Sequence, residues 1–255
     1  MLLAVTALRG YAIEATDGRL GTASDFLFDD ESWTVRWLVI DTGGWLTGRK
    51  VLIHPSAIAH ADHDSGRLVV ALTRAQVEGS PAIFDHQPVS QRLEASLYDY
   101  YRWDPYWGSN YFPIGAMALP LSSPPFFGAV ADRGSLRLEA SPGGEDSRLR
   151  SIAEVKGYHI HATDGAIGHL ENFLIDDAQW DIRYLIVDTK NWWPGQHVLL
   201  SPFAVREIIW SDRRIMLNVA RDNVKTSPPW DPIAMIDQVY EKALHRHYGW
   251  PGYGF

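Results

Sequence analysis

The sequence predicts an all-β dominated fold, in which two small β-barrels stand in tandem and a short α-helix follows each of them. Three observations lead to this expectation. One segment of the chain occurs twice, each copy contains about six short runs rich in β-branched and aromatic residues, and turn-forming residues separate these runs. A linker rich in Gly, Pro and aromatic residues joins the copies.

The repeat is visible in the printed sequence. The segment GYAIEATDG at 10–18 returns as GYHIHATDG at 157–165, an offset of 157 − 10 = 147 residues. The same offset relates Trp103 to Trp250 without a gap. A period of this kind indicates one structural unit used twice. Residues that lie 147 positions apart are therefore counterparts in the two copies.

The region between the copies has no counterpart later in the chain. Its first half is rich in Gly, Pro and aromatic residues, and its second half is rich in Gly, Pro and Ser, as in a linker. We therefore expect a first domain with its helix at 1–103, a linker at 104–150, and a second domain with its helix at 151–255.

Each copy reads as a series of strands separated by polar turns. The third strand of the first copy ends Leu-Val-Ile, which indicates burial on both faces. Pro55 ends the fourth strand, because proline has no backbone N–H to donate. The expected strands of the first copy are 9–15, 21–28, 33–41 and 50–53, followed by a hairpin over 57–72. The second copy repeats this order.

Two kinds of Asp-containing dipeptide mark the turns. An Asp-Gly pair follows the first strand of each copy, and glycine accepts a positive φ without a Cβ clash. An Asp-Asp pair follows the second strand, where Asp side chains accept hydrogen bonds from nearby backbone groups. We favour this structural role over paired catalytic carboxylates. The expected turn residues are Asp17, Gly18, Asp164, Gly165, Asp29, Asp30, Asp176 and Asp177.

A helix is expected behind each set of strands. Residues 88–97 contain Ser90 and Glu94 in the pattern of a capped helix start, and residues 237–244 are the matching segment of the second copy. This helix could either seal the end of its own barrel or bridge the two copies.

The repeat resembles the PRC-barrel family over residues 9–77 and 156–224. The motifs that carry the resemblance are an opening Gly-Tyr-x-Ile, a Thr-Asp-Gly-x-x-Gly turn, a Trp-x-x-Arg strand that ends Asp-Thr, and a closing Val-Leu strand before Pro. The segment 89–103 is similar to the extension of bacterial PRC-barrel proteins. The resemblance implies a compact barrel of about six strands and does not imply an active site. Family members include the cytoplasmic domain of the photosynthetic reaction centre H subunit and a domain of a ribosome maturation factor.

Composition limits the classes of partner and chemistry. The chain has 255 residues, a net charge of −8 and no cysteine. The acidic balance argues against nucleic acid, which favours a basic surface. Missing cysteines exclude disulfides and thiolate chemistry. Residues 1–9 lack the basic region of a signal peptide, and no run approaches the ~20 apolar residues of a membrane span. We expect a cytoplasmic protein without a transmembrane segment, for which peripheral docking on a membrane complex stays open.

No group of residues has the pattern of a catalytic site. Nucleophile, phosphate-binding and dinucleotide-binding motifs do not occur in a suitable setting. His159 and His161 lie on one strand face and could hold a metal ion, but the first copy has Ala12 and Glu14 there. We therefore expect no catalytic residue, no cofactor and no native metal site, and we do not expect an enzyme.

Aromatic residues are the strongest candidates for an interface. Exposed aromatic side chains dominate interface energetics, and the alternative is packing between the barrels and the linker. The candidate interaction residues are Trp45, Trp192, Trp193, Tyr101, Trp103, Tyr106, Trp107, Tyr248 and Trp250.

Three functions remain open on the sequence. The leading one is a non-catalytic protein-interaction or scaffold module, in which a pseudo-symmetric barrel pair binds an unidentified protein partner. The second is an accessory protein like the H subunit, which supports photosynthetic or respiratory electron transport at a membrane complex; it rests on the family resemblance. The third is a small-molecule binder or hydrolase that uses the cleft between the barrels.

Overall fold

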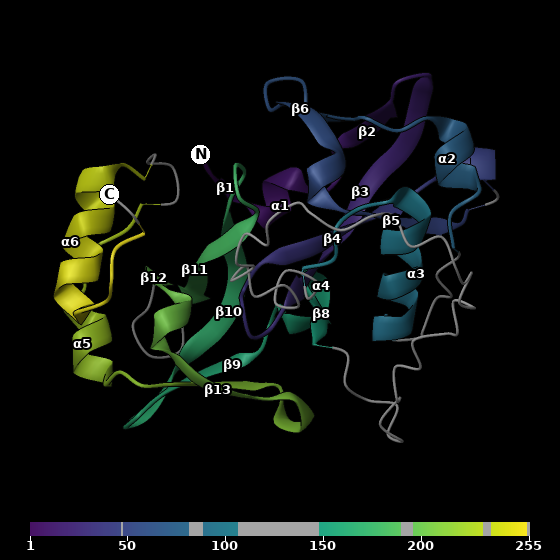
Figure 1. Ribbon diagram of the computed structural model, residues 1–255. Coiled ribbons are helices and arrows are strands. Elements are labelled where there is room, and N and C mark those ends of the chain that lie inside the picture. Colours follow the sequence, from purple (N-terminus) through teal and green to yellow (C-terminus); the bar gives the residue numbers. More distant parts are fainter. Residues whose placement is uncertain (47, 82–88, 107–147, 190–195, 232–235, 254–255) are drawn as a thin grey trace, which may run out of the picture. The chain divides into compact units, whose positions relative to one another are not determined.

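A computed structural model describes residues 1–46, 48–81, 89–106, 148–189, 196–231 and 236–253 (Figure 1). The chain divides into two compact units. One unit consists of Met1–Gln87 together with Arg148–Phe255, and the other of Pro88–Ser147. Both repeats therefore contribute their strands to one unit. The domain boundaries expected at residues 103 and 150 stay predictions.

The first copy forms a sheet with the strand order β5-β4-β3-β2-β7-β6. Neighbouring strands are antiparallel, except that β2 and β7 are parallel. The strands are β2 (Ala12–Ala15), β3 (Gly18–Asp29), β4 (Val35–Asp41), β5 (Lys50–Ile53), β6 (Ile58–Asp62) and β7 (Arg67–Val70).

The second copy repeats this topology in the order β12-β11-β10-β9-β14-β13, again with one parallel pair, β14 with β9. The predicted β-dominated fold is confirmed: one topology is used twice, and short helices follow each sheet along the chain. The strands are β9 (His159–Ala162), β10 (Gly165–Asp176), β11 (Asp181–Asp188), β12 (His197–Leu200), β13 (Val205–Ile209) and β14 (Arg214–Leu217).

Each sheet gains a seventh strand from the other copy. Strand β1 (Leu2–Ala4) precedes the first copy but pairs with β10, beside which it lies in Figure 1. Strand β8 (Leu149–Ser151) precedes the second copy but pairs with β3. The two pairings have the same register. Leu2 lies opposite Asp176 and Leu149 lies opposite Asp29, and each of these residues is the counterpart of one in the other pairing. The two copies thus exchange their first strands reciprocally.

The helices also occur in matched pairs. The last helix of each copy begins after a side-chain cap, where Ser90 accepts from the N–H of Leu93 and Asp237 accepts from the N–H of Tyr240. The helices are α1 (Val5–Leu8), α2 (Arg74–Glu78), α3 (Gln91–Tyr101), α4 (Ile152–Val155), α5 (Arg221–Lys225) and α6 (Gln238–Tyr248). Short 3₁₀ turns are η1 (Gly43–Leu46), η2 (Pro55–Ala57), η3 (Pro202–Ala204) and η4 (Trp210–Asp212).

Some strands begin later than the sequence predicts. The strand expected from residue 9 starts at Ala12, because Gly10 has φ +87° and ends the short helix α1 in a turn. The strand expected from residue 33 starts at Val35, because Trp33 adopts a left-handed φ of 58°. Its counterpart Trp180 has φ 61°, so both copies share this irregular start.

Helix α6 covers the sheet of the second copy. Leu244 is fully buried against Tyr184 and Leu199 from the sheet, and Tyr248 and Trp250 pack around the same cluster. Leu2 from the exchanged strand β1 joins it. The helix of the second copy therefore packs on its own sheet, which is one of the two arrangements that the sequence left open. None of the described helices has the length and the apolar character that a membrane span needs.

Candidate functional site

The two copies meet at counterpart residues. The hydroxyl of Thr34 donates to Asp181 at 2.7 Å, and these residues are themselves 147 positions apart. On either side, the N–H of Val35 donates to the carbonyl of Trp180, and the N–H of Ile182 donates to the carbonyl of Trp33, both at 2.8 Å. The reciprocal bonds place Thr34 and Asp181 on a pseudo-twofold axis between the copies.

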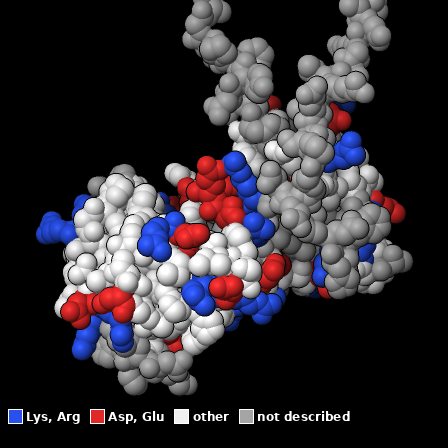
Figure 2. Space-filling model, turned by 90° about the horizontal axis from the view of Figure 1, so that it is seen from below, with Lys and Arg blue, Asp and Glu red and all other residues white. Residues whose placement is uncertain are grey.

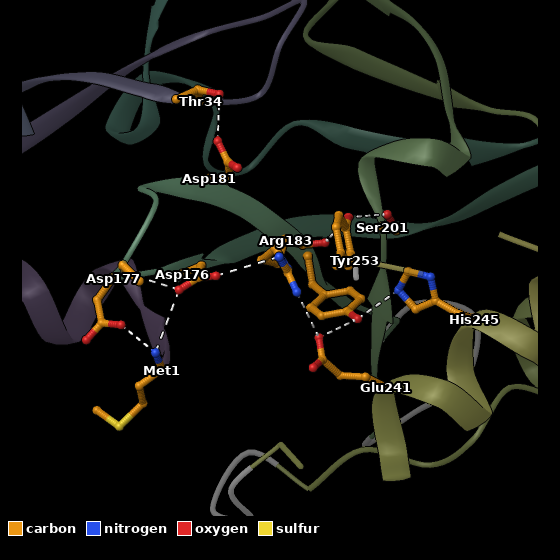
Figure 3. A network of polar contacts seen from close by, with 12 residues as sticks. Met1, Thr34, Asp176, Asp177, Asp181, Arg183, Ser201, Glu241, His245 and Tyr253 are labelled. Carbon is orange, nitrogen blue, oxygen red and sulfur yellow. Dashed lines mark hydrogen bonds and ion pairs between the residues drawn. The ribbon is translucent and has the colours of Figure 1, made fainter. Parts of the chain in front are cut away.

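A second polar network lies around Arg183 of the second copy (Figure 3). Arg183 lies 3.6 Å from Asp176 and 3.8 Å from Glu241 of α6. Its guanidinium also stacks on the ring of Tyr253 at 3.7 Å. The hydroxyl of Tyr253 contacts Ser201 at 2.7 Å. Arg183 thereby connects the sheet, the last helix and the C-terminal segment.

Tyr184 sits beside this arginine and is completely buried. Its hydroxyl donates to Glu241 at 2.9 Å and lies 2.9 Å from Nε2 of His245. Burial and the neighbouring carboxylate raise the pKa of Tyr184 far above its ordinary value. Burial lowers the pKa of His245, against the raising effect of its contact with the carbonyl of Pro251. In both groups burial therefore disfavours the charged form.

The first copy carries different residues at the same places. Trp37 is the counterpart of Tyr184, and His54 is the counterpart of Ser201. The ring of His54 lies edge-on to Trp37 with centroids 5.6 Å apart, and its Nδ1 accepts from the N–H of Ser56. Burial, helped by the charge of Arg36, lowers the pKa of His54 to about 4.

The hairpin tips of the two copies also reach across the junction. His63 Nε2 lies 2.9 Å from Asp177 Oδ2. Burial alone would raise the pKa of Asp177, but hydrogen bonds from the Met1 amino group and His63 outweigh it and leave the pKa below its ordinary value.

The counterpart contact uses a permanent charge. Arg150 Nε lies 2.9 Å from Asp30, and the same guanidinium stacks on Trp210, the counterpart of His63, at 4.2 Å. One side of the junction therefore pairs an imidazole with a carboxylate, and the other pairs a guanidinium with a carboxylate.

A groove opens on the first-copy side of the axis. Its volume is about 490 Å³, and both copies line it. Arg36, His54 and His60 come from the first copy, whereas Asp177 and Gln179 come from the second. This size falls within the range of small-molecule sites, and the lining offers both charged and neutral hydrogen-bonding groups.

The predicted turn residues make backbone contacts. Asp17 accepts from the N–H of Arg74 at the start of α2, and Asp164 makes the same 2.8 Å contact with Arg221. Asp29 accepts from the N–H groups of Glu31 and Ser32. Five predicted turn residues remain. Gly18 and Gly165 have φ of 143° and 146°, Asp176 accepts from the N–H of Ala178, and Asp30 and Asp177 lie at the junction.

The predicted interaction residues fall in several environments. Trp45 is half-buried, donates to the carbonyl of Leu20, and lies under the guanidinium of Arg74. Tyr248 stacks on Trp250 with centroids 4.0 Å apart, within the cluster under α6. In the other unit, Tyr101 stacks on Trp103 at 4.3 Å, and Tyr106 lies near Tyr98. Trp107, Trp192 and Trp193 lie outside the described residues.

Phe203 is an exposed aromatic residue that the sequence did not single out. It is 42% exposed and stacks on Tyr253 with centroids 5.5 Å apart. Its counterpart is Ser56, so the feature belongs to the second copy alone. The difference between Phe203 and Ser56 at matching positions of the two copies is the sequence signal that could have revealed this residue.

Charge is mixed on the face drawn in Figure 2. There, described Lys and Arg side chains lie next to Asp and Glu side chains, without a continuous basic field of the kind that nucleic acids bind. Across the described part of the chain, no three His, Asp or Glu side chains are grouped so that they could hold a metal ion.

Comparison with known proteins gives one family match. The model of the PRC-barrel domain matches residues 2–77, which include the exchanged strand β1, helix α1 and strands β2 to β7. No protein with curated annotation matches the chain. The second copy is similar to the first in strand order and register.

Proposed function

We propose that this chain is a non-catalytic protein-interaction or scaffold module. The observation that carries the proposal is the reciprocal exchange of β1 and β8, together with the axis at Thr34 and Asp181. The two copies within one chain are thus arranged like the two subunits of a symmetric dimer. Fusion lets each copy change its surface independently, so one chain can present two unlike faces to a partner. The match of residues 2–77 to a PRC-barrel domain supports a non-catalytic role.

The partner surface in this proposal includes Phe203 of the second copy and Trp45 of the first. Both are aromatic, and neither is fully buried. Large aromatic side chains at the centre of an interface contribute most of the binding energy. The other predicted aromatic residues contribute to internal packing, to the interface, or to both.

Affinity capture with matched variants tests this function. The natural control is Phe203→Ser, which installs the residue that the first copy carries at that position. We expect a stoichiometric protein partner with the wild-type chain and loss of that partner with Phe203→Ser or Trp45→Ala, while both variants keep their circular dichroism spectra. Failure to capture any stoichiometric partner under several growth conditions counts against the module.

The groove supports a second candidate function, a small-molecule binder. It is lined by both copies and carries Arg36, His54 and Gln179. Ligand-observed NMR with a fragment library would identify binders. His60→Ala, at an exposed position in the lining, should weaken them if the groove is the site.

An accessory role at a membrane complex, in the manner of the H subunit, is the third candidate. It rests on the family resemblance, as does a bacterial origin. Co-sedimentation with native membranes at low salt tests it, and a chain that stays entirely in the supernatant would argue against it.

A further inference from the structure

A row of polar side chains crosses the outer face of the second sheet. Directly opposite residues in adjacent strands share a face, so the registers place these five residues side by side. The sheet's other face holds the buried Ile160, Leu170 and Val187. The row, in strand order, is Arg214, His159, His169, Asp188 and His197.

The two central histidines are unusually close. His159 of β9 lies opposite His169 of β10, and the N–H of His159 bonds to the carbonyl of Arg213 on the other side. His159 and His169 therefore form a pair without mutual backbone hydrogen bonds, the type in which side chains approach most closely. Their ring centroids are 4.6 Å apart, with the rings tilted by 50°.

This separation suits a shared metal ion. A zinc–nitrogen bond of about 2.0–2.1 Å puts the ion about 3.2 Å from each ring centre. Two imidazoles that share one ion at an angle of about 90–110° then have ring centres about 4.5–5.2 Å apart. The observed 4.6 Å lies in this range. His159 is exposed and His169 half-buried, so an ion can reach the pair from solvent.

We propose that His159 and His169 form a two-imidazole site for a divalent transition-metal ion such as Zn²⁺. Imidazole nitrogen is a preferred ligand of Zn²⁺. The described residues contain no group of three candidate ligands, so water or a donor from another molecule completes the coordination. Asp188 beside His169 favours a cation, whereas Arg214 beside His159 opposes one and limits the affinity.

The first copy supplies matched control variants. Its residues at these positions are Ala12 and Thr22, in the same register of the same topology. His159→Ala and His169→Thr therefore install residues that the scaffold already accepts. His247→Ala serves as a control for nonspecific binding by an exposed histidine elsewhere.

Calorimetric titration of the full chain with ZnCl₂ tests the site. We expect the wild-type chain and His247→Ala to bind one equivalent that EDTA removes, and each sheet variant to bind at least about tenfold more weakly. In the wild-type NMR spectrum, the ring protons of His159 and His169 should shift first. Unchanged affinity in both sheet variants, shifts confined to other histidines, or no uptake at about 1 mM Zn²⁺ would overturn the proposal.

Discussion

Gly21 and Gly168 occupy positions where the backbone leaves no space for a side chain. A Cβ on Gly21 would lie 2.0 Å from the carbonyl oxygen of Asp41, and a Cβ on Gly168 would lie 1.9 Å from that of Asp188. These close approaches accompany the register shifts in the long strands β3 and β10.

Gly21→Ala should therefore lower the free energy of unfolding by about 3 kcal/mol, because the strands must separate to admit a methyl group. Gly44→Ala is the matched control, since nothing lies within 4 Å of a Cβ there. Urea unfolding of both variants measures the difference. Equal urea midpoints for Gly21→Ala and Gly44→Ala would contradict the close approach of Gly21 to the Asp41 carbonyl.

His54 makes stability depend on pH. Its pKa is lowered to about 4 in the folded chain, whereas an unfolded histidine titrates near its ordinary value of 6.5. Between these values the unfolded chain binds the proton and the folded chain does not, so stability falls as the pH drops from about 6.5 to 4. The loss should amount to about 1–3 kcal/mol, because His54 is only partly screened by solvent.

Unfolding measured at pH 7 and pH 4.5 checks this expectation. His54→Ser, which carries the residue of the second copy, should flatten the pH dependence, and His60→Ser should not. Some slope will remain, because the pKa of His245 is also lowered by burial. If the stability of His54→Ser falls with acid as steeply as that of the wild-type chain, His54 is not the cause of the pH dependence.

Asp25 anchors the exchanged strand β8 to the first sheet. Its carboxylate accepts from the hydroxyl of Ser151 and, at 3.1 Å, from the N–H of Ala153. The counterpart is Asn172, whose side-chain amide donates to Thr6 at 2.7 Å beside β1. Both anchors fix the chain where an exchanged strand passes into a short helix.

Asp25→Ala should destabilise the chain by about 1–3 kcal/mol, because two donors lose a charged acceptor. Asp25→Asn keeps an acceptor oxygen and should retain part of the stability. Hydrogen exchange at residues 149–153 provides a local measurement, with faster exchange expected in Asp25→Ala. Protection as strong as in the wild-type chain would show that β8 is held by its backbone pairing alone.

The sequence predicted best what local chemistry decides. The strand at 50–53 has the predicted bounds, and helices α3 and α6 begin after the polar residues Ser90 and Asp237. Proline stops, side-chain caps and runs of apolar residues each act within a few positions, so they can be read from one chain.

The exchanged strands could not be predicted in this way. β1 and β8 have three residues each, which is too short for a periodic pattern, and residues 148–150 were assigned to the linker. Their partners lie more than 100 positions away. The contact of His159 with His169 was also missed, because it depends on a register shift between Ala166 and Gly168. Only the pair His159 and His161 is apparent from sequence spacing.

The exchange has a consequence for the whole chain: neither sheet is complete without the other copy. Residues 1–87 supply β1 to the second sheet, and residues 148–255 supply β8 to the first. Backbone bonds beside the axis at Thr34 and Asp181 add to this connection. Covalent continuity between the copies is therefore not what holds the two sheets together.

A chain cut between the copies should consequently behave as one particle. We expect that, after a protease recognition sequence is placed between residues 120 and 140 and cleaved, both fragments co-elute from a sizing column at the volume of the intact chain. They should separate only in denaturant, and dilution should lower their melting temperature, because unfolding now releases two molecules. Fragments that elute separately in native buffer, each with native circular dichroism, would show that each sheet is stable without the strand it receives.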